Sequence, residues 1–461
     1  MNRVAVVGGG LSGLALAHAL RRRAAPDSPI RVSVFERDQR AGGLLCTERI
    51  GGFLCEYGPN GFLDRAPATM ALVDALGLTG RLQPSHDNAR RRFIYRGGRL
   101  RAVPSGPLGL FGSGVLSVRG ALRLAAEPLV GRPAVTADES IYAFAARRFG
   151  REAASVLADA MVSGVFGGDA RQLSMRACFP TVARMEAEHG SVVRALLARR
   201  GSTGDRRGRG LGRLTSFKDG MAELVDALTH AIGTNLHLST GVQRLQSIGD
   251  CYQLTLSDGR STEAEAVVLT GGGATSARLL ANTDAALVAD LTAIPSAPMV
   301  TVCLGYPAAA IGHRLDGFGF LAPRSAGLRL LGVLWESSIF SDRAPAGHAL
   351  LRVMVGGATD PDVVDLDDER LLARVQRELR ATMRVTGQPE LVRVIRHRPG
   401  IPQYIGGHGE RLARIESALE HRPGLFVGGH AFGGVGINAC IEYASALADR
   451  VIGALTRRAV A

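Results

Sequence analysis

The sequence predicts an α/β protein, because strand-like and helix-like segments alternate along it. Residues 4–7 form an apolar, β-branched run, residues 14–23 have helical composition, and residues 31–35 form a second strand-like run. The chain therefore opens with a βαβ unit. A late strand at residues 425–428 and a helix at residues 437–455 close it. With 461 residues, 46% of them hydrophobic, the chain can form about two to four domains with substantial cores.

Composition and periodicity predict further elements between these ends. Helices are expected at residues 64–83, 140–148, 152–163, 191–200, 216–232 and 367–385. Strands are expected at residues 236–238, 241–248, 252–256, 264–270, 298–306, 328–335 and 349–355. An arginine- and glycine-rich run at residues 201–213 predicts an exposed loop.

Arginine supplies nearly all of a large positive charge. The formal net charge is +13, from 55 Lys and Arg against 42 Asp and Glu, and Lys218 is the only lysine. Arginine suits carboxylates, phosphates and acidic lipid head groups. Because aromatic residues make up only 5% of the chain and no nucleic-acid-binding motif is present, we expect no nucleic-acid partner.

Cysteine spacing argues against a metal-binding protein, and hydropathy argues against a membrane-spanning one. The six cysteines form no CxxC pair and no Cys/His cluster with zinc spacing, so we expect no metal site. The longest uncharged stretch, residues 291–313, contains prolines and glycines that break a membrane-spanning helix. Residues 1–20 look like a signal peptide, but a strand, a glycine turn and a helix account for their apolar run. We therefore expect a cytoplasmic protein.

A glycine turn between the first strand and the first helix predicts a dinucleotide site. Gly8, Gly10 and Gly13 form a GxGxxG motif, whose glycines allow a tight turn and bring a pyrophosphate close to a helix N-terminus. Glu36 ends the next strand, 23 residues after Gly13, where an acid binds the ribose hydroxyls.

Two further glycine-rich segments favour FAD over a nicotinamide. Gly42 and Gly43 follow Glu36 closely, where the chain can pass a long cofactor. Residues 428–438 place a glycine loop between a strand and a helix, and such a helix N-terminus stabilises negative charge on a reduced flavin. An enzyme that binds a nicotinamide through one N-terminal motif does not need this second turn, so we predict FAD.

A series of short segments extends this pattern along nearly the whole chain. They are Gly42-Gly43-Leu44, Glu56-Tyr57-Gly58-Pro59-Asn60-Gly61-Phe62, residues 91–95 with Pro104-Ser105, residues 163–169 with Leu173-Ser174, and residues 216–221, 317–321, 340–345, 355–357, 401–404 and 434–437. Through their number and order the chain resembles the glucose/amine-oxidase type of flavoprotein, and within that type the protoporphyrinogen oxidase family.

The resemblance implies a Rossmann-like FAD-binding domain assembled from residues 1–85, 214–297 and 396–461. It also implies a mixed-sheet substrate domain at residues 298–395 and a helical, membrane-associated domain at residues 86–213. The implied enzyme oxidises protoporphyrinogen IX to protoporphyrin IX in heme biosynthesis, in three two-electron steps. Oxygen is the acceptor and hydrogen peroxide the second product.

The resemblance implies substrate contacts for six residues. Arg92 is expected to pair with a propionate, as a guanidinium can hold a carboxylate through two hydrogen bonds. The others are Asn60 near the flavin, Gly164 at the pocket wall, and Leu315, Leu331 and Leu351 against the macrocycle. From spacing alone, a surface arginine in a basic run is the favoured interpretation of Arg92, and the leucines fit an ordinary core.

The resemblance also implies the FAD contacts, including backbone contact of Val242 with the adenine. The full set is Gly8, Gly10, Leu11, Ser12, Gly13, Glu36, Arg37, Gly43, Leu44, Tyr57, Gly58, Pro59, Asn60, Val242, Gly429, Val435, Gly436 and Ile437. Two positions depart from the family: His397 stands where relatives often have tryptophan, and His430 lies in a segment that usually reads Gly-Asn-aromatic. No catalytic triad or carboxylate pair stands out, so no residue is assigned as acid or base.

An apolar stretch flanked by arginines predicts contact with a membrane surface. Residues 102–118 carry no charge, and they are flanked by Arg99, Arg101, Arg119 and Arg123. Such a segment can lie on an anionic bilayer. A buried loop with charged flanks is the alternative.

Three other functions also fit the sequence. One is oxidation of coproporphyrinogen III, which carries four carboxylates where protoporphyrinogen IX carries two. Another is a flavin amine oxidase, although Trp335 is the only tryptophan available for an aromatic cage. The third is a flavoprotein that carries porphyrin or docks on membranes without turnover. The oligomeric state stays open, and a homodimer is compatible with the sequence.

Overall fold

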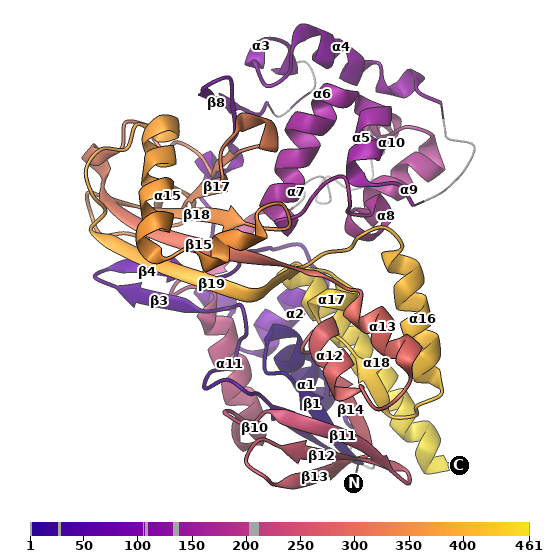
Figure 1. Cartoon of the computed structure of the whole chain (residues 1–461). Helices are drawn as coiled ribbons and strands as arrows, with labels where there is room; N and C mark the ends of the chain where they lie inside the picture. The colour runs from indigo at the N-terminus through magenta and orange to yellow at the C-terminus, as the bar shows by residue number, and fades with distance from the viewer. Residues whose placement is uncertain are drawn as a thin grey trace.

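The computed structural model describes residues 2–25, 29–104, 106, 109–131, 138–201 and 212–460. Figure 1 shows three parts: a region around a parallel sheet at the bottom, a broad mixed sheet in the middle, and a group of helices at the top. The bottom region holds both chain ends, so the first and last parts of the sequence fold together. Of the expected 201–213 loop, residues 202–211 lie outside the described residues.

A five-stranded parallel sheet forms the bottom region, in the order β10-β2-β1-β14-β20. The strands are β10 (Leu236–His237), β2 (Ile30–Phe35), β1 (Asn2–Val7), β14 (Ala266–Leu269) and β20 (Leu425–Val427). Val4 and Val6 pack with Val32 and Val34 against helices on one face, whereas Ala5 and other alternate residues face the opposite core. Both faces are buried, which is why these strands are almost wholly apolar.

Helices from distant parts of the chain cover the two faces of this sheet. One face carries α1 (Leu11–Arg23), α2 (Pro67–Ala75), α11 (Ala222–Ile232) and α18 (Ile437–Val460). The other carries α12 (Gly273–Leu279), α13 (Ala285–Thr292), α16 (His408–Glu420), α17 (His430–Gly433) and the small sheet of β11 (Val242–Ile248), β12 (Cys251–Leu256) and β13 (Ser261–Ala264). The expected Rossmann-like unit built from separated segments is therefore present.

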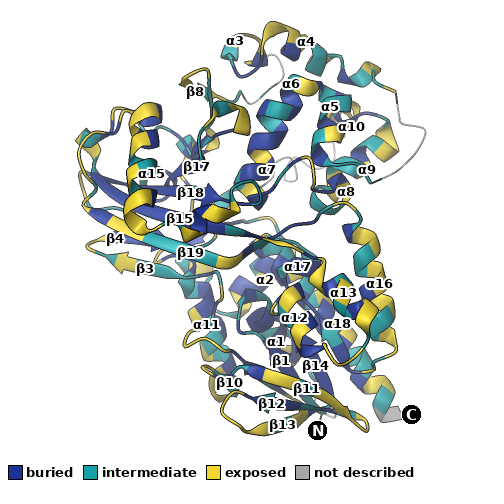
Figure 2. Ribbon diagram, in the orientation of Figure 1, coloured by how far each residue is buried: buried dark blue, intermediate teal, exposed yellow. Residues whose placement is uncertain are grey.

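A seven-stranded mixed sheet forms the middle region, and helix α15 (Asp368–Met383) covers one of its faces. Its order is β19 (Leu391–Pro402), β15 (Ser296–Pro307), β18 (His348–Gly356), β17 (Leu330–Trp335), β16 (Gly319–Leu321), β7 (Arg92–Arg96) and β8 (Arg99–Ala102). Strand β7 pairs in parallel with β16, although more than 200 residues separate them. Figure 2 shows the central strands β15, β18 and β17 largely in the dark blue of buried residues, whereas the edge strand β19 is mostly intermediate or exposed.

The pairing of β7 and β8 corrects one predicted boundary. Residues 92–102 were expected in the helical part that starts at residue 86, but they extend the mixed sheet. The helices of the top region begin afterwards: α3 (Leu110–Ser113), α4 (Val118–Ala125), α5 (Ile141–Phe149), α6 (Arg151–Ala153), α7 (Asp159–Phe166), α8 (Met175–Cys178), α9 (Pro180–His189) and α10 (Val192–Gly201). The division into three domains itself stays a prediction.

Two expected helices are wrong in part. The helix expected at residues 64–83 ends at Ala75, because Gly77 takes a left-handed conformation, and strand β6 (Leu82–Pro84) follows. The helix expected at residues 216–232 begins only at Ala222. Its first part is strand β9 (Leu214–Phe217), which pairs with β5 (Phe62–Leu63) and with β6. Propensity favoured helix at both places, but pairing with a distant strand decided the structure.

Hydropathy gives one further result. Among the residues that the structure describes, no helix is long and apolar enough to cross a membrane. The hairpin of β3 (Thr47–Ile50) and β4 (Phe53–Glu56) completes the fold and leads into the segment that contains Asn60.

Candidate functional site

The N-terminal glycine turn is built so that side chains cannot enter it. Gly8 has φ +116°, and a Cβ on Gly13 would overlap the Gly8 carbonyl oxygen and lie 2.9 Å from Thr270 Oγ1. The Thr270 hydroxyl donates to the carbonyls of Val7 (3.0 Å) and Gly8 (3.1 Å), which ties β14 to the turn. Helix α1 then begins after Gly10 with no side-chain cap. Its first backbone N–H groups are left for an anion such as pyrophosphate.

Glu36 lies at the end of β2, next to this turn. Its carboxylate accepts hydrogen bonds from the backbone N–H groups of Gly9 (2.6 Å) and Asp38 (2.9 Å), and the residue is only 8% exposed. A buried acid held by the glycine turn is suited to the ribose hydroxyls of a dinucleotide. The backbone of Glu36 also accepts from Thr240 N–H (2.7 Å), so the start of β11 lies beside it.

The predicted adenine-binding residues lie close to Glu36. A Cβ on Gly241 would approach Cβ of Arg37 to 3.1 Å, and Val242 follows at once in β11. Val242 is buried, and its carbonyl accepts from Arg278 Nη2 at 3.2 Å. The Arg37 side chain is exposed and lies 3.6 Å from Asp38. The structure therefore brings Arg37 and Val242 to the same end of the sheet as Glu36.

The second glycine segment runs directly past the first. Gly10 and Gly42 form a parallel bridge, and a Cβ on Gly43 would lie 3.2 Å from Gly10 Cα. A Cβ on Gly58 would overlap the carbonyl oxygen of Leu44, so the segment 57–60 packs on the Gly43–Leu44 turn. These contacts bring Gly43, Leu44, Tyr57, Gly58, Pro59 and Asn60 into one region.

The C-terminal turn joins the same region. Gly429 has φ +99°, and its Cβ would lie 2.9 Å from the Thr270 carbonyl oxygen. Leu11 packs in the same core as Ile437 and Cys440, so the first turns of α1 and α18 lie side by side. A Cβ on Gly436 would meet nothing within 4 Å. Val435, Gly436 and Ile437 therefore present a second open helix start near Leu11 and Ser12.

These features together fit FAD. The turns at Gly8–Gly13, Gly42–Gly43 and Gly429–Gly436 meet around β1 and β14, and bulkier residues would fill the space that they leave. An acid for the ribose and uncapped helix starts for the negative groups complete the set. Thr270, which contacts all three of Gly8, Gly13 and Gly429, was missed by sequence reasoning, since a threonine at a strand end carries no distinctive signal.

Two histidines mark departures from the family pattern. His397, on β19, lies with Nε2 3.0 Å from the Tyr57 carbonyl oxygen, and burial lowers its pKa. His430 opens α17 directly after Gly429, and burial lowers its pKa as well. The position of His397 next to Tyr57 places it beside the predicted FAD contacts.

Arg92 differs from the other arginines of its basic run. Arg90 lies 3.7 Å from Asp87, Arg91 pairs with Asp316, and Arg96 pairs with Glu152. Among the described residues no carboxylate pairs with Arg92, whose guanidinium rests 5.1 Å from the ring centre of Phe318. An exposed arginine held by a ring and left without an acid is suited to an incoming carboxylate.

The other predicted substrate residues divide between two places. Gly164, on α7, faces the sheet, because its Cβ would lie 2.5 Å from Leu321 Cδ2. Leu331 is 7% exposed on β17, just before the irregular pairing at Gly332. Leu351 is fully buried and packs in the core beneath α15, and the partly buried Leu315 packs against the same core.

The structure therefore places Leu351 and Leu315 in the core beneath α15, and their contact with the macrocycle stays a prediction. Successive residues of a strand point to opposite faces. Leu351 faces the α15 core, whereas its neighbour Arg352 faces the segment that carries Asn60. On the same side as Arg352, Met354 and Leu334 form an apolar cluster with Phe318. This apolar cluster, rather than the leucines beneath α15, lies near Arg92.

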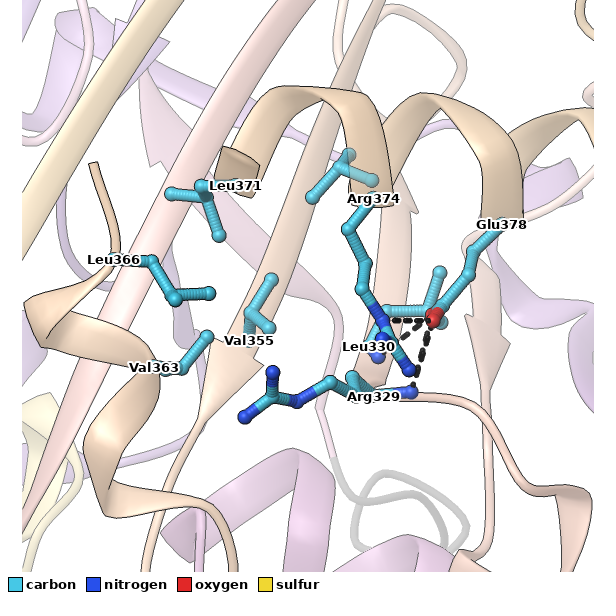
Figure 3. Close-up of a pocket in the computed structure, with 9 residues that line it drawn as sticks. Arg329, Leu330, Val355, Val363, Leu366, Leu371, Arg374 and Glu378 are labelled. Atoms are coloured by element: carbon cyan, nitrogen blue, oxygen red, sulfur yellow. Dashed lines mark hydrogen bonds and ion pairs between the residues drawn. The ribbon is translucent and has the colours of Figure 1, made fainter. Parts of the chain in front are cut away.

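Two cavities lie elsewhere. Figure 3 shows the first, beneath α15, where Arg374 and the backbone N–H groups of Arg329 and Leu330 bond to Glu378. Its volume of about 10 Å³ holds no more than one water molecule. A larger groove, about 690 Å³, runs between α16, β20 and α18. None of the predicted FAD or substrate residues lines either one.

The family model of the flavin containing amine oxidoreductases matches residues 11–452. The chain belongs to this family. Its cofactor is FAD, as the geometry of the three glycine turns indicates. No metal-binding cluster of His, Cys, Asp and Glu is present among the residues that the structure describes.

Curated relatives match over almost their full length. Coproporphyrinogen III oxidase of Bacillus subtilis is 28% identical over 454 residues, covering 96% of both chains. Protoporphyrinogen oxidase 1 of Arabidopsis thaliana is 32% identical over 480 residues, covering 98% of this chain and 88% of the relative. A crystal structure from Exiguobacterium, provisionally assigned as a protoporphyrinogen oxidase, superposes with a TM-score of 0.85 at 25% identity and covers 98% of both chains.

Proposed function

We propose that this protein is an oxygen-dependent oxidase that converts protoporphyrinogen IX to protoporphyrin IX and releases hydrogen peroxide. The full-length similarity to named porphyrinogen oxidases supports the proposal. The structural observation that carries it is Arg92, which alone in its basic run has no acidic partner among the described residues. A porphyrinogen presents carboxylates on a large apolar ring, and Arg92 lies beside an apolar cluster.

The residues of the chain bind and orient the ring. When bound, FAD supplies the hydride acceptor that oxygen returns to its oxidised form. Arg92 holds a propionate at the edge of the site. Phe318, Leu334 and Met354 offer an apolar surface that excludes water from the reacting carbon. Each two-electron step removes one hydride and one proton, so three steps consume three oxygen molecules and give three peroxides.

Coproporphyrinogen III is a second candidate substrate, because the relatives from Bacillus subtilis and Propionibacterium freudenreichii are coproporphyrinogen III oxidases. Both reactions would use the same cofactor and the same chemistry at the ring. They differ in the two extra carboxylates of coproporphyrinogen. Turnover of each porphyrinogen in air is measured by the fluorescence of the porphyrin formed. The substrate with the higher kcat/KM is then assigned as the substrate of this enzyme.

We further propose that the helical region contacts a membrane surface. Of the predicted stretch 102–118, residues 105, 107 and 108 lie outside the described residues, and Val115 and Leu116 are buried. Phe111 and Val118 of the stretch are exposed, and exposed apolar side chains continue beyond it at Leu122 on α4 and at Leu129, which is 83% exposed. Apolar side chains next to arginines suit an anionic bilayer, which would also dissolve a hydrophobic substrate.

A further inference from the structure

Asn60 is held by an acidic residue from a distant part of the chain. Its Nδ2 donates to both carboxylate oxygens of Glu336, at 3.2 and 3.1 Å, although 276 residues separate the two. Asn60 is 7% exposed and Glu336 is 1% exposed. Glu336 begins α14 (Glu336–Ile339), directly after β17, so the mixed sheet reaches the predicted FAD contacts at this point.

An arginine fixes this acid and the backbone around it. Arg352 Nε lies 2.8 Å from Glu336 Oε1, and its Nη1 donates to the carbonyl oxygens of Gly58 and Glu56. Arg352 is 6% exposed and stands on β18, which is pinned between two neighbouring strands. The charge of Glu336 is therefore paired, and the segment that ends in Asn60 is tied to the same guanidinium.

The acid decides which way the Asn60 amide points. A carboxylate only accepts hydrogen bonds, so the amide nitrogen has to face Glu336 and the amide oxygen has to face away. Among the described residues no donor hydrogen-bonds to Asn60 Oδ1. This oxygen is not one of the buried polar atoms that lack a partner, so it is open to an incoming donor. Oδ1 is thus a free acceptor with a fixed direction.

We propose that Glu336 and Arg352 are positioning residues that present Asn60 Oδ1 as an acceptor to a pyrrole N–H of the porphyrinogen. The inference rests on the proposed function. A porphyrinogen carries four pyrrole N–H donors and no acceptor at its ring nitrogens, so an acceptor in an apolar pocket recognises it, whereas a flipped amide would place donor against donor. A buried donor without a partner is strongly unfavourable, which gives the orientation its effect.

An exchange of the two side chains tests the proposal. In N60D two buried carboxylates face each other, and we expect kcat/KM to fall at least about 100-fold. In E336Q the amide of Asn60 can flip, and we expect a fall of about tenfold. In the double variant N60D/E336Q the amide introduced at position 336 can donate to the carboxylate introduced at position 60. The other oxygen of that carboxylate again serves as the acceptor, so we expect activity at least about tenfold above N60D.

Two further measurements separate positioning from folding. Each variant is loaded with FAD, its flavin content and melting temperature are measured, and binding of protoporphyrin IX is followed by its absorbance shift without turnover. The matched control is E127Q, which breaks another fully buried pair, Glu127 with Arg148, in the helical region. We expect E127Q to lower the melting temperature and to leave kcat/KM and porphyrin binding unchanged.

The outcomes are distinct. If wild type oxidises neither porphyrinogen, the proposed function fails whatever the variants do. If wild type is active but the double variant is no better than N60D in turnover and porphyrin binding, with flavin content preserved, the positioning role is refuted alone. The positioning role is supported if kcat/KM recovers in the double variant and the melting temperatures of the variants do not follow the order of their kcat/KM values.

Discussion

Glu56 connects the stability of the protein to pH. Its side chain is 1% exposed and accepts hydrogen bonds from Thr47 Oγ1 (2.7 Å) and from the Met221 backbone N–H (2.8 Å). Burial nevertheless dominates and raises the pKa of the carboxyl from 4.5 to about 7; the nearby Arg343 opposes the rise and Glu336 adds to it. We expect Glu56→Gln, which keeps the size and stays neutral, to remove this pH dependence.

The direction follows from proton binding. Between pH 4.5 and pH 7 the folded protein keeps the Glu56 proton while the unfolded chain has lost it, so wild-type stability falls as pH rises through this window. Above pH 7 the unfolding free energy stays lower by the full amount, because Glu56 is then ionised in both the folded and the unfolded protein. A difference of about 2.5 pKa units corresponds to about 3 kcal/mol, because one unit is 1.36 kcal/mol. The advantage of E56Q should therefore be small near pH 4.5 and reach about 3 kcal/mol near pH 8.

Chemical denaturation measures this difference. Wild type and E56Q are unfolded in urea at pH 5 and pH 8 with saturating FAD, and the difference in unfolding free energy between the two proteins is compared across pH. The prediction is a difference that grows with pH. A difference that is equal at both pH values, or larger at pH 5, would refute the assignment of Glu56 as a buried acid with a raised pKa.

The remaining predictions concern the cofactor, the substrate and the membrane. Gly13→Ala should weaken FAD binding at least about tenfold by titration of the apoprotein, because its Cβ overlaps the turn, whereas Gly80→Ala, which meets nothing within 4 Å, should not. Arg92→Ala should raise KM for a porphyrinogen roughly 10- to 100-fold with little change in kcat, as expected for one charged hydrogen-bond pair; an unchanged KM would contradict the role. Replacing the exposed Leu122 and Leu129 by Asp should reduce co-sedimentation with anionic vesicles several-fold and leave activity on dispersed substrate intact; equal sedimentation would remove this surface from the account.

Local motifs made the cofactor site predictable. The turn at Gly8–Gly13 and the acid at Glu36 lie within one βαβ unit, so their spacing alone reports their geometry. The C-terminal turn before Ile437 was also visible, since a glycine loop between a strand and a helix is a local pattern. Family resemblance then connected these separated segments, and the parallel pairing of β1, β14 and β20 explains why they meet.

The parts of the fold and of the site that depend on pairing between distant strands could not be predicted from the sequence. Strand β7 joins the mixed sheet by pairing with β16, and no feature of residues 92–96 alone signals that partner. The position of Leu351 was not predictable for the same reason, because the sequence shows an apolar strand but not which of its faces meets α15. One signal was available: Arg352 is a charged residue inside an otherwise apolar strand, and such a residue requires a buried partner. That partner, Glu336, is the link to Asn60.

The most direct test of the central claim is turnover of protoporphyrinogen IX and coproporphyrinogen III in air by the FAD-loaded protein, with porphyrin fluorescence and peroxide both measured. The account predicts a rise in fluorescence with about three peroxides formed per porphyrin, since each two-electron step reduces one oxygen molecule. A higher kcat/KM for protoporphyrinogen IX supports the proposed substrate, and the reverse order assigns coproporphyrinogen III. No fluorescence from either, together with a bound flavin that stays oxidised when porphyrinogen is added without oxygen, would contradict the account.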